Sequence, residues 1–122
     1  MADQPNTQTY DGACHCQAVT FKVDLDLSGA LQCNCSICNK LGAVWAFAPA
    51  SKLQLKSGKD RLGDYQFGKK TLHHRHCSVC GVEPFAEGRM PDGTPTVGIN
   101  LRCLAGVDVA GLSPRQWDGA SK

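Results

Sequence analysis

Cys14-His15-Cys16, Cys33-Asn34-Cys35-Ser36-Ile37-Cys38 and Cys77-Ser78-Val79-Cys80 are the stretches that decide the fold, and they hold seven of the eight cysteines in the chain. Clusters this tight favour a metal ion over disulfides, because a Cys-x-Cys bridge closes a very small, strained ring. A zinc ion takes thiolates at about 2.3 Å in a tetrahedron, and two cysteines in one turn can both reach it. The spacing therefore predicts zinc, and a disulfide scaffold is the alternative.

The number of clustered thiols indicates two different sites. Two closed structural zinc sites need eight ligands, whereas seven thiols divide into four plus three, and a zinc ion with three protein ligands keeps one position open for chemistry. If the two cysteine pairs share one ion, that site is closed and structural, and it joins the first strand to a late one. The pairs are Cys14/Cys16 and Cys77/Cys80, and the remaining triplet is Cys33, Cys35 and Cys38.

The ligand type of the triplet restricts its chemistry. Three thiolates donate much electron density to zinc, so we expect weaker activation of water than with three neutral histidines. Such a site binds another soft ligand well, and an incoming thiol held there is a nucleophilic thiolate at neutral pH. The triplet therefore predicts attack of a thiol on an electrophile rather than hydrolysis. An aldehyde and a redox electrophile both fit.

Length and charge narrow the class of protein. A chain of 122 residues corresponds to one domain with a modest core, so bound metal is expected to supply much of the folding free energy. The formal charge of +2 gives no reason to expect a nucleic acid or a membrane as partner. Residues 1–9 are polar and predict a flexible tail without a signal peptide. Many free thiols without a secretory signal predict a cytoplasmic protein.

The hydrophobic pattern predicts a mainly β domain over residues 10–119. Val19–Leu27 alternates apolar and polar residues, as a half-buried strand does, and Ala43–Ala48 is apolar on both faces, as a buried strand is. Further strands are expected at 53–55, 64–67, 71–76 and 97–102. Short helical turns are expected after Cys38 and at Ser113–Trp117. We expect Trp45 and Phe47 to lie in the core.

The ordered cysteine clusters resemble the glutathione-dependent formaldehyde-activating enzyme family, which includes the centromere protein V type of domain. The resemblance covers about residues 10–119 and implies an Mss4-like fold, a small, mainly β domain built around zinc knuckles. One departure lies in the triplet, where Asn34 stands at a position at which the family often has histidine. The matching stretches are Gly12-Ala13-Cys14-His15-Cys16, Cys33–Cys38, Cys77-Ser78-Val79-Cys80-Gly81, Val97–Leu104 and Trp117-Asp118-Gly119.

The resemblance also implies the ligand sets and an activity. It places a structural zinc on one set of cysteines and the catalytic zinc on the other, and the activity joins glutathione to formaldehyde as S-hydroxymethylglutathione, a carbon–sulfur lyase reaction in reverse. The partners are then a thiol such as glutathione and a small aldehyde. Lys40, Lys69, Lys70, Arg75 and Arg89 are candidates to meet the glutathione carboxylates. The structural set is Cys14, Cys16, Cys77 and Cys80, and the catalytic set is Cys33, Cys35 and Cys38.

Two further residues could act as metal ligands. Cys103 is expected to share a strand face with Val97, Ile99 and Leu101 and is interpreted as a buried apolar cysteine. As a fourth ligand of the triplet it would close that site and make the protein structural. His76 could replace a cysteine as ligand, although four thiols already suffice.

Three further functions fit parts of the sequence. The histidines at 73, 74 and 76 beside Lys69, Lys70 and Arg75 could form a nucleic-acid patch, but a polar strand face with His74 and His76 partly packed fits the low net charge better. A non-catalytic zinc domain that binds protein or chromatin is the second function class, after the lyase. A thiol redox sensor with a reversible Cys33–Cys38 disulfide is the third function class.

Overall fold

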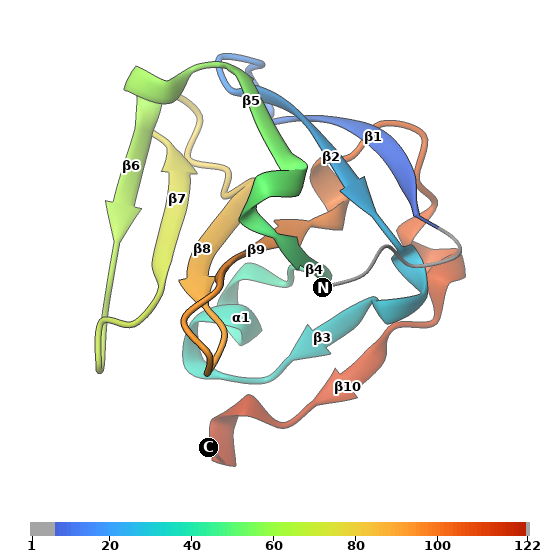
Figure 1. Cartoon of the computed structure of the whole chain (residues 1–122), viewed down its shortest axis with the longest axis vertical. Coiled ribbons are helices and arrows are strands. Elements are labelled where there is room, and N and C mark those ends of the chain that lie inside the picture. Colours follow the sequence, from blue (N-terminus) through green and yellow to red (C-terminus); the bar gives the residue numbers. More distant parts are fainter. Residues whose placement is uncertain (1–6, 122) are drawn as a thin grey trace.

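Ten strands in two sheets form most of the structure, a computed structural model that describes residues 7–121 (Figure 1). The smaller sheet has the order β1-β2-β5, with β1 (Gln8–Ala13), β2 (Thr20–Leu25) and β5 (Leu53–Ser57). The larger sheet has the order β10-β3-β4-β9-β8-β7-β6. Its strands are β3 (Leu31–Cys33), β4 (Trp45–Pro49), β6 (Leu62–Tyr65), β7 (His73–Cys77), β8 (Phe85–Arg89), β9 (Pro95–Asn100) and β10 (Arg115–Trp117).

Helical structure is limited to short pieces. The α-helix α1 (Ser36–Leu41) lies between β3 and β4. Single 3₁₀ turns occupy Leu27–Gly29, Ala50–Lys52, Lys59–Arg61, Leu101–Cys103, Val109–Leu112 and Gly119–Ser121. The prediction of a mainly β protein is confirmed. Within residues 7–121, no helix has the length and apolar composition needed to cross a bilayer.

The core lies between the two sheets. Along β2 every second side chain is buried, and Phe21, Val23 and Leu25 are each at most 2% exposed. They belong to one hydrophobic cluster with Phe85 of β8 and with apolar side chains of β4 and β9. Phe21 and Phe85 meet edge to face, with ring centroids 5.8 Å apart. This packing leaves the opposite face of the large sheet free.

The opposite face of the large sheet begins with the aromatic residues of β4. Since side chains alternate along a strand and Ala46 and Ala48 face the core, Trp45 and Phe47 turn the other way. Trp45 is 3% exposed but Phe47 is 54% exposed, so the prediction that Phe47 lies in the core is wrong. The physical reason is that β4 carries apolar residues on both faces, while only one face packs against the small sheet.

Three element predictions need correction. The helical turn expected at Ser113–Trp117 is β10, which pairs in parallel with β3. The strand expected at 64–67 is β6, which starts two residues earlier and pairs with β7. β1 begins at Gln8, inside the tail expected over residues 1–9; residues 1–6 of that tail lie outside the described residues. The sequences of β10 and β1 have only weak hydrophobic patterns. These segments form strands because they pair with neighbouring strands.

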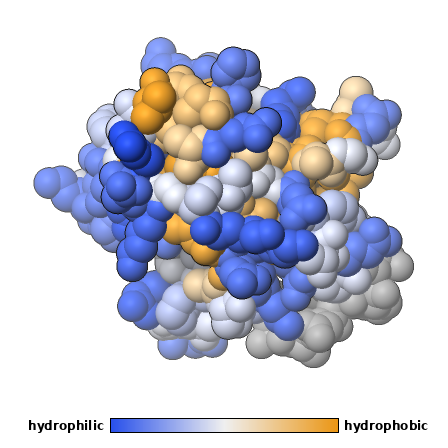
Figure 2. Space-filling model, turned by 90° about the horizontal axis from the view of Figure 1, so that it is seen from above, coloured by the Kyte–Doolittle hydropathy of each residue, from blue (hydrophilic) through white to orange (hydrophobic). Residues whose placement is uncertain are grey.

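The connections β1–β2 and β7–β8 carry the first and third cysteine clusters to the same end of the molecule, at the top of Figure 1. Figure 2 looks down on this end and shows mostly hydrophilic side chains, with the apolar ones in separate patches. The second cluster lies between β3 and α1, next to the free face of the large sheet. The two groups of cysteines are thus separate.

Candidate metal centres and the adjoining cavity

Four thiols from two distant turns meet at the first candidate centre. The sulfur atoms of Cys14, Cys16, Cys77 and Cys80 all lie within 4.8 Å of one another. The Sγ atoms of Cys14 and Cys16 are 3.7 Å apart, and those of Cys16 and Cys77 are 3.6 Å apart. A tetrahedron with zinc–sulfur distances of about 2.3 Å has edges of about 3.8 Å, so this donor set fits one zinc ion.

The backbone of the two turns is arranged to support thiolates. Val19 donates its backbone N–H to Cys14 Sγ at 3.4 Å, and Val79 donates to Cys77 Sγ at the same distance. Backbone hydrogen bonds, first from Val82 and then from Cys16, lower the pKa of Cys80 to about 6. Hydrogen bonds to the charged form favour ionisation, which a cation needs in its sulfur ligands. Gly81 closes the second turn with a φ of +84°.

Three thiols from one loop form the second candidate centre. Cys33 ends β3, Cys35 precedes α1 and Cys38 lies within α1, and their sulfur atoms all lie within 4.8 Å of one another. Cys35 donates its backbone N–H to Cys33 Sγ at 3.4 Å. Gly42 ends the helix in the left-handed conformation and donates to the Cys38 carbonyl oxygen at 2.9 Å. The local chain alone therefore gathers this donor set, which fits three ligands of one zinc ion.

Ionisation within the triplet is uneven. Burial opposes ionisation of Cys35, yet hydrogen bonds from the backbone and thiol of Cys38 and from Cys33 lower the pKa of Cys35. Burial, together with the neighbouring thiols of Cys35 and Cys33, raises the pKa of Cys38. Like charges this close disfavour one another, so the three thiols ionise together only with a cation between them. The donor set is therefore matched to a bound metal.

The triplet has three donors and no fourth among residues 7–121. The groups of histidine, cysteine and acidic side chains that could hold a metal there are the four-thiol and the three-thiol groups, and neither includes Cys103 or His76. Cys103 lies in the 3₁₀ turn after β9, not on a strand face with Ile99, and it is half-buried. Burial raises the pKa of Cys103 to about 11, which makes it a poor nucleophile.

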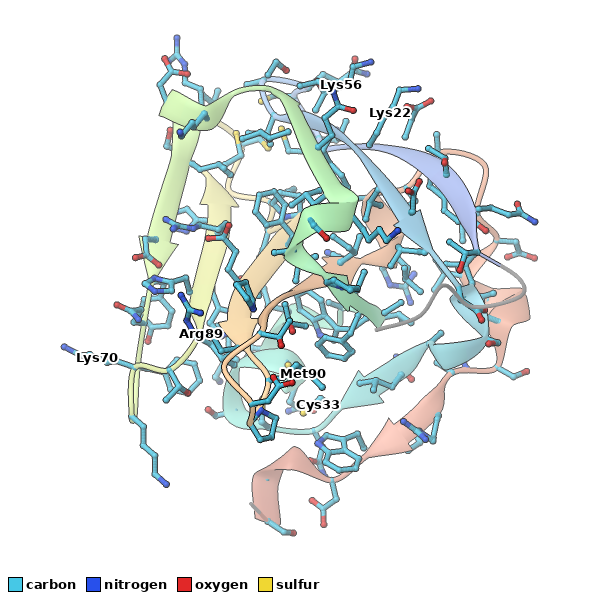
Figure 3. The ribbon with its side chains drawn as sticks, viewed as in Figure 1. Lys22, Cys33, Lys56, Lys70, Arg89 and Met90 are labelled. Atoms are coloured by element: carbon cyan, nitrogen blue, oxygen red, sulfur yellow. The ribbon has the colours of Figure 1, made fainter. Side chains whose placement is uncertain are left out.

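A cavity of about 490 Å³ adjoins the triplet on the free face of the large sheet. All three cysteines line it. Five of its lining side chains are large, apolar and at least 39% exposed, namely Phe47, Phe67, Leu72, Met90 and Trp117. Exposed apolar side chains gathered in one place mark a binding surface. Figure 3 shows Cys33, Met90 and Arg89 on the same side of the molecule.

Asn34 fixes the C-terminal segment to the triplet loop. Its amide nitrogen donates to Asp118 Oδ1 at 3.0 Å, and its amide oxygen accepts the backbone N–H of Ala120 at 2.9 Å. Gly119 lies so close to Cys33 that a Cβ there would come within 2.5 Å of its Sγ. Asn34 thus holds the segment that follows β10 against the triplet loop.

Of the cationic side chains that the sequence suggests for binding carboxylates, some line the cavity and others do not. Arg89 lines the cavity, where its guanidinium donates to the Gly93 carbonyl oxygen at 2.8 Å. Arg115 of β10 also lines it, and this residue was missed from the sequence because its strand was interpreted as a helical turn. Arg75 is bound to Glu87 at 2.8 Å instead. Lys70 extends outward at the edge of the molecule (Figure 3). Lys40 and Lys69 do not line the cavity.

His74 and Glu83 form a buried pair that was also missed from the sequence. His74 is 4% exposed and Glu83 is 6% exposed, and the imidazole Nδ1 lies 2.9 Å from Glu83 Oε2. The expectation that His74 is packed is confirmed. The register of β7 and β8 places His74 opposite Ala86, and Glu83 lies in the connection before β8, so the spacing of the two residues gives no signal of their contact.

Comparison with known proteins agrees with this arrangement. A family model described as glutathione-dependent formaldehyde-activating enzyme matches residues 9–116. A crystal structure of a Rhodobacter sphaeroides protein, a structural-genomics target, is similar to this chain with a TM-score of 0.78 and 34% sequence identity. The match covers 88% of this chain and 98% of that one. With both candidate centres within the matched residues, the chain belongs to the glutathione-dependent formaldehyde-activating enzyme family.

Proposed function

We propose that this protein is a zinc-dependent carbon–sulfur lyase that joins a thiol, glutathione, to formaldehyde or a similar small aldehyde. The observation that carries the proposal is a group of three thiols, without a fourth protein donor in the described chain, at the wall of a cavity. Family membership supports the same chemistry. The protein would act as one zinc domain over residues 10–119.

In this proposal the two centres have different tasks. Cys14, Cys16, Cys77 and Cys80 hold a structural zinc, and Cys33, Cys35 and Cys38 hold the catalytic one. When bound to the triplet, zinc lowers the pKa of an incoming thiol and keeps it as a nucleophile. The adduct also forms spontaneously in water, so positioning the two reactants and ionising the thiol suffice for catalysis.

The cavity side chains would bind and orient the thiol. Phe47, Phe67 and Trp117 offer apolar surface that excludes water from the reacting sulfur. Arg89 and Arg115 offer guanidinium groups that match the two carboxylates of glutathione. Three of the sequence candidates for this task, Lys40, Lys69 and Lys70, do not line the cavity, and Arg75 is paired with Glu87.

The non-catalytic functions receive less support. An interaction module was expected to have Cys103 on the triplet or a basic face that gathers Lys69, Lys70 and Arg75. Cys103 lies outside the three-thiol group, and Arg75 contacts both Glu87 at 2.8 Å and Asp64 at 3.9 Å. A cavity beside the three thiols has no role in a closed structural site.

The proposal is tested by exchange NMR between glutathione and formaldehyde. Protein loaded with two zinc ions per chain is expected to accelerate the exchange above the spontaneous rate, and protein stripped by a chelator is not. The Cys103→Ala variant, which changes a thiol outside both centres, serves as control and is expected to match the wild type. Equal exchange rates with and without the loaded protein would contradict the proposal.

Substitution of Arg115 tests the thiol subsite. The Arg115→Ala variant is expected to raise the KM for glutathione about tenfold, because it removes a charge-assisted hydrogen bond to a carboxylate. The rate with 2-mercaptoethanol, which has no carboxylate, is expected to stay unchanged. Arg61→Ala, an exposed arginine outside the cavity lining, is the matched control. An equal loss with both thiols would mean that Arg115 does not recognise the carboxylates.

A further inference from the structure

Two buried nitrogen atoms have no hydrogen-bond partner. Among residues 7–121, the buried side-chain nitrogen and oxygen atoms without a partner are Trp45 Nε1 and His74 Nε2. Both side chains line the cavity that the three cysteines line. Buried polar atoms almost always have partners, and each exception needs a specific explanation, such as a catalytic role or a bound water or ion. Two such nitrogen atoms belong to side chains in the wall of this one cavity.

The bond at the other ring nitrogen fixes what His74 Nε2 can do. Glu83 Oε2 lies 2.9 Å from Nδ1 and, as a carboxylate oxygen, only accepts. Nδ1 therefore carries the hydrogen, and in the neutral ring Nε2 is left with a free lone pair. The ring is held by stacking against Phe67, with centroids 5.8 Å apart. A carboxylate, an oriented imidazole and a free Nε2 form the arrangement of a general base.

We propose that Nε2 of His74 is the general base and acid of the reaction, taking the proton of the incoming thiol and returning it to the aldehyde oxygen, with Glu83 as a positioning residue. This inference rests on the proposed function. The triplet loop itself offers no such group, because the side chain of Asn34, between two of its cysteines, is engaged with Asp118 and Ala120.

The proposed step balances without any further reactant. The S–H bond breaks, and its proton moves to Nε2 while the electron pair stays on sulfur. The S–C bond forms as the π pair of the carbonyl moves onto oxygen. The Nε2–H bond then breaks, and its proton completes the hydroxyl group of the S-hydroxymethyl product. Nothing is oxidised or reduced, and His74 returns to its starting state.

The charges around the ring set the pH range of this role. The hydrogen bond to Glu83 raises the pKa of His74, burial opposes this, and the negative charge of Glu83 adds to the rise. Tyr65 is the residue opposite His74 on β6, and on β7 itself His73 is bound to Asp64 and Arg75 to Glu87. The base must be neutral, so activity is lost as the pH falls through a raised pKa.

The test compares two histidines of the same strand. In His74→Asn the amide nitrogen can take the place of Nδ1 and keep the bond to Glu83, while Nε2 is removed. This variant, with zinc content verified, is expected to lose about 100-fold of the catalysed exchange rate. His73→Asn is the matched control and is expected to keep it, since His73 is not part of the cavity lining. An unchanged rate in His74→Asn would overturn the proposal and leave the proposed function standing.

Glu83→Gln separates positioning from packing. The glutamine oxygen still accepts from Nδ1, but it carries no charge to raise the pKa of His74. The acid limb of the pH–rate profile is therefore expected to move to lower pH. A purely structural role would lower the rate at every pH without moving the limb, and that result would overturn the role of Glu83.

A readout independent of turnover tests the proton acceptor itself. In ¹⁵N NMR of the zinc-loaded protein, His74 is expected to carry its hydrogen on Nδ1 and to gain one on Nε2 when glutathione, or 2-mercaptoethanol, is added. If Nε2 gains no proton with either thiol, the proposal is overturned. If Nε2 gains the proton and formaldehyde exchange is not accelerated, the base is supported and the proposed electrophile fails instead.

Discussion

A Cys77→Ser protein is expected not to fold. Cys77 is fully buried at the end of β7, and its sulfur lies 3.6 Å from that of Cys16, across 61 positions of sequence. Under the proposed assignment, serine replaces one of four thiolates and releases the zinc that joins β1–β2 to β7–β8. Structural zinc supplies about 10–16 kcal/mol in zinc-finger peptides, which is as large as the whole stability of about 5–15 kcal/mol of a typical domain.

The packing around this centre gives no substitute for the metal. The apolar cluster there has three buried members, Cys14, Val19 and Cys77, and two of them are ligands. Removal of zinc therefore leaves buried thiols and few apolar contacts at this end of the molecule. We expect the loss of the cooperative thermal transition, both in the variant and in wild-type protein treated with a strong chelator.

The measurement is thermal unfolding followed by circular dichroism, with zinc content determined on the same sample. Cys103→Ser is the matched control, a cysteine outside both groups, and it is expected to keep the transition and both zinc ions. A Cys77→Ser protein that unfolds cooperatively near the wild-type temperature would show that the fold does not depend on this centre.

Cys35→Ser is expected to have the opposite profile, an intact fold without activity. All three triplet ligands lie within six residues of one loop, so the metal there closes no long-range contact. Loss of one of three ligands is expected to reduce the zinc content from two ions to one per chain. The exchange of glutathione and formaldehyde is expected to fall to the spontaneous rate, because nothing remains to hold the thiol as thiolate.

The readouts for this variant are zinc content, the unfolding midpoint and the exchange rate, measured side by side. Ser36→Ala, a change at the adjacent residue, is the control and is expected to match the wild type in all three. Full activity of Cys35→Ser at a zinc content of one would place the chemistry elsewhere. A collapse of the unfolding midpoint would make the triplet structural.

The strands that could be predicted are those with strong local patterns. β2 alternates cleanly because one face packs on the core and the other meets water, and β4 is apolar on both faces because a cavity covers the second one. Four strands, β1, β3, β8 and β10, were missed. β8 contains Gly88 and an ion-paired Glu87, and β10 has three exposed residues, so both depend on neighbouring strands rather than on their own sequences.

The three cysteine clusters follow from the sequence and the cavity does not. Thiols two or three positions apart must lie close together, so spacing alone predicts each cluster, whereas the joining of Cys14/Cys16 with Cys77/Cys80 was implied by the family resemblance. The lining of the cavity includes Trp45, His74, Gly98 and Arg115, which lie on four strands and meet only through sheet pairing. For the same reason, the sequence suggested Lys69 and Lys70 as candidates to bind the glutathione carboxylates and did not suggest Arg115, which lines the cavity.

The most direct test of the central claim, one closed centre and one open to thiol, is ¹¹³Cd NMR of protein in which cadmium replaces zinc. Two resonances are expected, and added glutathione is expected to shift only one of them, the one that is absent in Cys35→Ser. A single resonance, or two resonances whose chemical shifts both stay unchanged when glutathione is added, would contradict the claim that Cys33, Cys35 and Cys38 hold a metal ion open to thiols.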